Sequence, residues 1–181
     1  DDRSMGYERG TSVSRAWDEA ATDAALETAG YVASRLDRLA GTRPDASDRE
    51  EKIRAFCKTF VERAFRRPVP EDRMQAYVDR RFGPGIDLDT SVKRVVLATL
   101  MSPAFLYHEV SGSEDQYDVA SRLSFGLWDS APDRELLTAA SKGELKSRGQ
   151  AVKQAERMVN DLRTRAKLRD FLLQWLRVDR V

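Results

Sequence analysis

The chain contains one cysteine and one histidine among its 181 residues, and each scarcity narrows the chemistry it can perform. A single cysteine excludes a disulfide within the chain and any metal site built from a cysteine cluster. A single histidine excludes paired-histidine metal motifs, so we predict no metal site. No stretch approaches about 18 uncharged apolar residues, and we therefore expect no membrane span.

The chain also lacks a strong net charge. Its 31 Lys and Arg face 30 Asp and Glu, for a formal charge of +1, which argues against a uniformly basic nucleic-acid binder. The charge is uneven, however, because residues 142–181 hold eleven Lys and Arg but five acids. This polarity is typical of a solvated helix face, or of a surface that docks an acidic partner or another copy of the chain. Nucleic-acid binding by this segment is the weakest alternative.

Glycine and proline are few, at ten and six, and they separate segments with apolar residues at helical spacing. The clearest spacing predicts a helix through Ile53 and Phe65. Other helices are expected over 14–40, 71–81, about 90–100 and 162–177, with capping boxes at Ser47, Ser113 and Ser147. On 14–40 the inward side is expected to carry residues 17, 21, 24, 32, 36 and 39.

No segment shows the long alternation typical of strands. We therefore predict an all-α bundle of about seven to eight helices, with an extended arm over 1–12 and a single helical domain over 13–181. The last helix carries an apolar stripe at Leu168, Phe171, Leu172, Trp175 and Leu176. It ends without a Gly or Asn exit, which favours a fragment of a larger protein. We expect the uncovered side of Trp175 and Leu176 to be exposed or held by another chain.

Two residues are candidates for reactive chemistry. His108 lies beside Glu109 near a loop, where it could act as a general base. No nucleophile accompanies it by motif, and the simpler interpretation is a surface or capping histidine. Cys57 shares the face of Ile53 and Phe65, so we predict a buried, inert thiol rather than a redox or ligand role.

Charged residues near apolar stripes suggest either ion-pair networks or a pocket for a carboxylate, phosphate or haem propionate. The candidates are Arg66, Arg67, Arg122, Asp129 and Asp133. Arg122 lies at the edge of a stripe, and acids follow it at 129, 133 and 135. We predict that Arg122 bonds an acidic side chain or a helix C-terminus and thereby fixes helix packing, because a buried unpaired charge is costly.

Four short segments carry a family resemblance: FVERAFRRP at 60–68, SPAFLY at 102–107, ASRLSFGLW at 120–128 and QWL at 174–176. Together they resemble the planctomycete-type cytochrome-c-associated domains of unknown function, which occur in large exported bacterial proteins and also in myxobacteria. The resemblance implies a periplasmic or exported location and a longer parent protein. It also implies haem c in a partner or a missing module, since this chain has no Cys-x-x-Cys-His motif.

Two functions follow as hypotheses. The first is a non-catalytic helical interaction or scaffold domain of an exported, cytochrome-c-linked protein, with a protein partner or neighbouring domain. The second is part of an oxidoreductase or hydrolase whose active site is completed by sequence or subunits not present here. A cleft in which His108, Arg122 or Arg66 meets a carboxylate would favour the enzyme, and flat apolar or charged surfaces would favour the scaffold.

Overall fold

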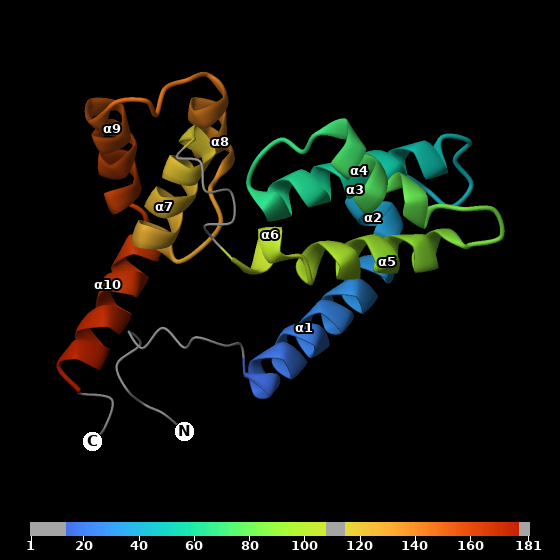
Figure 1. Ribbon diagram of the computed structural model, residues 1–181, viewed down its shortest axis with the longest axis horizontal. Coiled ribbons are helices and arrows are strands. Elements are labelled where there is room, and N and C mark those ends of the chain that lie inside the picture. The colour runs from blue at the N-terminus through green and yellow to red at the C-terminus, as the bar shows by residue number, and fades with distance from the viewer. Residues whose placement is uncertain (1–13, 108–114, 178–181) are drawn as a thin grey trace. The chain divides into compact units, whose positions relative to one another are not determined.

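The computed structural model describes residues 14–107 and 115–177 (Figure 1). These residues form ten α-helices, one 3-10 helix and no strand, which confirms the all-α prediction. They divide into two compact units, one within Val13–Val110 and the other within Ser111–Val181. The single domain over 13–181 stays a prediction, and the arm over 1–12 lies outside the described residues.

The first unit is built around α5. In chain order its helices are α1 (Arg15–Ala33), α2 (Leu36–Ala40), α3 (Arg49–Phe65), α4 (Glu71–Tyr77), η1 (Asp79–Arg81), α5 (Leu88–Leu100) and α6 (Pro103–Leu106). α1 packs along α5, and α3 packs on the same helix. The core brings together small residues of α1 such as Ala29, Ile53 and Val61 of α3, and Val92 and Val95 of α5. Small residues on α1 let α5 approach closely.

Three local predictions for this unit are wrong. The helix expected over 14–40 breaks at Ser34 and Arg35, where the Ser34 hydroxyl donates to the Tyr31 carbonyl oxygen at 2.9 Å and competes with the helix ladder. The helix expected over 71–81 becomes α4 followed by η1. The capping box at Ser47 does not form, because the N-cap of α3 is Asp48.

The inward side of α1 also differs from the expected one. The core residues are Ala25, Ala29, Val32 and Ala33, whereas Trp17 is exposed. Residues 14–20 are all exposed, and the Trp17 ring, although exposed, stacks on Tyr107 of the same unit with ring centres 6.4 Å apart (Figure 1).

The second unit contains α7 (Gln116–Trp128), α8 (Arg134–Ser141), α9 (Arg148–Val159) and α10 (Leu162–Trp175). Trp128 anchors its core and is 4% exposed, and its indole nitrogen donates to the Met158 carbonyl oxygen at 3.0 Å. The capping box at Ser147 is confirmed. α7 begins at the cap Asp115, and the cap expected at Ser113 lies outside the described residues. α10 has no buried residue.

Candidate functional site

Arg66 is a buried structural clamp. It is 5% exposed and ends α3 in the left-handed region, with φ 61°. Its guanidinium donates to four carbonyl oxygens at 2.8–3.3 Å, those of Ala64, Ala104, Phe105 and Tyr107. The last three belong to α6 and its C-cap, so a charged fork holds the end of a short helix against α3.

Two further candidates, Arg67 and His108, lie close to Arg66 in the sequence. Arg67 is partly exposed, and its backbone amide donates to the Glu62 carbonyl oxygen at 3.2 Å, which completes the exit of α3. His108 lies outside the described residues. The described side chains around Arg66 therefore serve helix packing.

Arg122 does not have the environment predicted for it. It is exposed rather than withdrawn from water. The acids expected as its partners bind other cations: Asp133 binds Arg157 with two hydrogen bonds, at 2.8 and 3.2 Å, and Asp129 lies 3.4 Å from Lys167. The partial burial predicted for Arg122 is therefore wrong, while its bond to an acidic side chain or a helix C-terminus stays a prediction.

Asp133 is the centre of the network that does form. Its carboxylate caps α8 by accepting from the Leu136 amide at 2.8 Å and also binds Arg157. Partial burial opposes ionisation, but the hydrogen bonds from Arg157 and Leu136 outweigh it and hold the pKa of Asp133 below its ordinary value. Arg157 also reaches Glu135 at 3.2 Å, so this pair links α8 to α9.

A second ion pair, between Arg163 and Asp161, lies beside the Trp128 ring of α7. The guanidinium of Arg163 stacks 3.5 Å from the ring centre of Trp128, and that of Arg157 lies 5.5 Å from it. Hydrogen bonds from Arg163 lower the pKa of Asp161, the N-cap of α10, to about 2. Both arginines are thus engaged in joining α7, α9 and the start of α10.

Cys57 is buried as predicted, with 1% exposure. Burial raises the pKa of its thiol to about 12, so the unreactive protonated form prevails at neutral pH.

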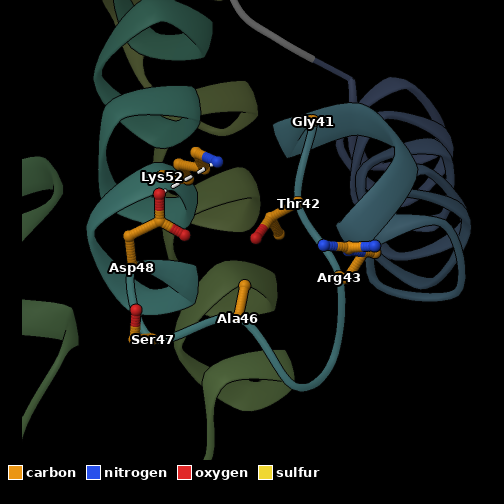
Figure 2. A pocket seen from close by; sticks show the side chains of 7 residues that line it. All are labelled: Gly41, Thr42, Arg43, Ala46, Ser47, Asp48 and Lys52. Atoms are coloured by element: carbon orange, nitrogen blue, oxygen red, sulfur yellow. Dashed lines mark ion pairs between the residues drawn. The ribbon is translucent and has the colours of Figure 1, made fainter.

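A surface hollow of about 390 Å³ lies at the turn between α2 and α3 (Figure 2). Its lining includes Thr42, Arg43, Asp48 and Lys52, and the Lys52 ammonium pairs with Asp48 at 2.9 Å. None of the predicted site residues lines this hollow. The described residues contain no group of three or more metal-binding side chains, and none of their helices is long and apolar enough to cross a membrane.

The most distinctive surface in the described chain is the apolar stripe of α10. It consists of Leu168, Phe171, Leu172, Trp175 and Leu176, all exposed, with Trp175 and Leu176 each at 62%. The rings of Phe171 and Trp175 stack with centres 6.1 Å apart. This confirms the prediction that Trp175 and Leu176 are exposed. A contiguous apolar face of this kind is a candidate binding surface.

Basic side chains border the stripe. Lys167 lies on one side, where its ammonium donates to the Phe125 carbonyl oxygen and fastens α10 to α7. On the other side Arg165 and Arg169 are exposed, and neither has an ion-pair partner among the described residues. The excess of Lys and Arg in residues 142–181 indicated a basic surface in this segment. It did not show which of these cations form ion pairs within the chain.

The fold and this surface define a class: in its described residues the chain is an all-α protein of two helical units, and the last helix, α10, exposes an apolar face. Two segments match models of protein families. Residues 52–109 match PSD5, a protein of unknown function (DUF1595), and residues 115–181 match PSD4, a protein of unknown function (DUF1592). One matched segment lies in each unit. No curated protein and no solved structure matches the chain.

Proposed function

We propose that this chain is a non-catalytic helical interaction module that uses the α10 stripe to hold a partner protein or neighbouring domain. The stripe is the observation that carries the proposal. Five large apolar side chains on one face are left exposed, at a cost of about 25 cal/mol for each Å² of apolar surface that stays in water. Covering that face with another helix recovers the free energy.

The engaged charges support the same function. Arg66, Arg157 and Arg163 are used in joining helices, and the two pairs around Trp128 fix the base from which α10 extends. A preformed helix that is fastened at its start and exposes an apolar face suits a scaffold, because it loses little conformational entropy on binding.

The setting of the module is also part of the proposal. The resemblance to cytochrome-c-associated proteins supports a place within a larger exported or periplasmic protein, and the two matched families are of unknown function. Haem c then belongs to a partner or a neighbouring module. An oxidoreductase or hydrolase role completed by other subunits stays an untested alternative.

Photo-crosslinking in the native host tests the interaction directly. Benzoylphenylalanine replaces Trp175, and in a control chain it replaces Lys153, an exposed residue on α9 of the same unit. We expect position 175 to give one major adduct, identifiable by mass spectrometry, and position 153 to give none.

A second substitution makes the result specific. Leu168→Glu interrupts the stripe at an exposed position, so it should abolish the adduct without unfolding the protein. Equal crosslinking from positions 175 and 153, or no adduct from either, contradicts the proposal.

A further inference from the structure

Two helices of the described chain present complementary exposed faces. α10 offers large apolar side chains bordered by Arg165 and Arg169, one turn apart on the same edge of the stripe. Cations at i and i+4 repel each other in an isolated helix by a few tenths of a kcal/mol. An anionic partner along that edge removes the repulsion, so the stripe selects a helix that carries acids.

α1 has the matching chemistry on its outer face. Ala16, Ala20 and Ala24 form an exposed row at i, i+4 and i+8, away from the core face that includes Ala25. A second row, Glu19, Asp23 and Glu27, runs beside it. Glu19 already pairs with Arg15 at 2.7 Å, whereas Asp23 and Glu27 have no ion-pair partner among the described residues.

The two faces also fit by shape. The alanine side chains are short, so the ridge formed by Phe171, Leu172 and Trp175 can pack closely against this face of α1. The alanine row and the stripe each extend over eight residue steps, about 12 Å at 1.5 Å per residue, so the two faces match in length. The acids of α1 then lie along the edge that carries Arg165 and Arg169.

We propose that the stripe of α10 docks on the outer face of α1 of a second copy of this chain. This inference rests on the proposed function and names its partner. Two copies related by a twofold axis form the contact twice, once in each direction, and cover both stripes. The proposed assembly is therefore a dimer with twofold symmetry.

The oligomeric state of the full chain tests the pairing through charge reversal. Sedimentation equilibrium should show a dimer, and Arg165→Glu with Arg169→Glu should weaken it about tenfold or more. Asp23→Arg with Glu27→Arg should weaken it similarly. All four changes in one chain restore opposite charges and should bring the dissociation constant back to within about threefold of the starting value.

A matched control separates specific pairing from net charge. Arg148→Glu with Lys153→Glu on α9 makes the same change in net charge as the α10 pair and should leave the dimer intact. Circular dichroism verifies that each variant folds. If both double variants lose the dimer and the variant with all four substitutions does not restore it, α1 is not the docking site of α10.

The outcomes also separate this inference from the proposed function. If the chain is a monomer at all concentrations and position 175 crosslinks to a different, identified protein, the second-copy inference is wrong. The proposed interaction module then still stands. A monomer that gives no adduct overturns both. The monomer can also be tested for binding to vesicles rich in phosphatidylserine. If it binds them, and Arg165→Glu with Arg169→Glu abolishes the binding, the stripe binds a lipid surface and the second-copy inference is wrong.

Discussion

Replacing Arg66 by alanine should strongly destabilise the first unit. The substitution removes two guanidinium nitrogens that donate to four carbonyl oxygens at 2.8–3.3 Å. A hydrogen bond to a charged group contributes about 1.5–3 kcal/mol, and water can replace part of that at the exposed C-cap Tyr107. We therefore expect Arg66→Ala to lower the free energy of unfolding by about 3 kcal/mol.

The left-handed backbone of Arg66 gives a second, independent expectation. At φ 61° a side chain costs about 1–2 kcal/mol relative to glycine, so Arg66→Gly should be less destabilising than Arg66→Ala by about 1 kcal/mol. Arg66→Lys should recover only part of the stability, because an ammonium cannot reproduce the planar fork.

Urea unfolding followed by circular dichroism measures these differences, and hydrogen exchange locates them. Exchange should accelerate in α6 and the end of α3, while α8 in the other unit should stay unchanged. An unfolding midpoint for Arg66→Ala equal to that of the unsubstituted chain refutes the clamp. A second result also refutes it: phosphate stabilises the unsubstituted chain, and Arg66→Ala abolishes that stabilisation. Arg66 is then an anion-binding residue.

Further substitutions test the packing of both units. Gly126→Ala should add about 0.5–1 kcal/mol to the free energy of unfolding, since a Cβ at this helical glycine meets nothing within 4 Å. Ser91→Ala should be neutral or stabilising in the same urea assay, because its buried hydroxyl has no hydrogen-bond partner. The lowered pKa of Asp133 stabilises the fold above about pH 3.9, the ordinary pKa, and the effect is lost as pH falls through the folded value. Asp133→Asn should therefore weaken the fold at pH 7 and flatten the acid dependence of its urea midpoint. Cys57 should react with a thiol reagent far more slowly in the native protein than in urea, and equal rates contradict its burial.

The sequence predicted helices correctly wherever apolar residues recur at regular helical spacing. The residues between Ile53 and Phe65 predicted α3 to within a few positions, and the stripe from Leu168 to Leu176 predicted both α10 and its exposure. The break at Ser34 was not readable, because one side-chain hydrogen bond leaves the apolar period unchanged. Periodicity alone predicts the existence of a helix better than its interruptions.

Charged contacts were harder to predict because they join distant parts of the chain. Asp133 was recognised as a partner for a cation, but its cation is Arg157, 24 residues further on, rather than the nearer Arg122. The clamp of Arg66 depends on carbonyl oxygens, and no side-chain pattern marks them. Such pairings emerge only from the packing of helices that the sequence separates.

A disulfide between two different chains tests the central claim most directly. One chain carries Ala20→Cys in the alanine row of α1, and the other carries Leu172→Cys in the stripe of α10. The native Cys57 is buried and its thiol pKa is raised to about 12, so it should not compete. Under mild oxidation, we predict a mixed disulfide in clear excess over its statistical share of the products, and above the yield from Ala20→Cys mixed with Lys153→Cys. Products in statistical proportion, or no mixed product, contradict docking of α10 on α1 of a second copy.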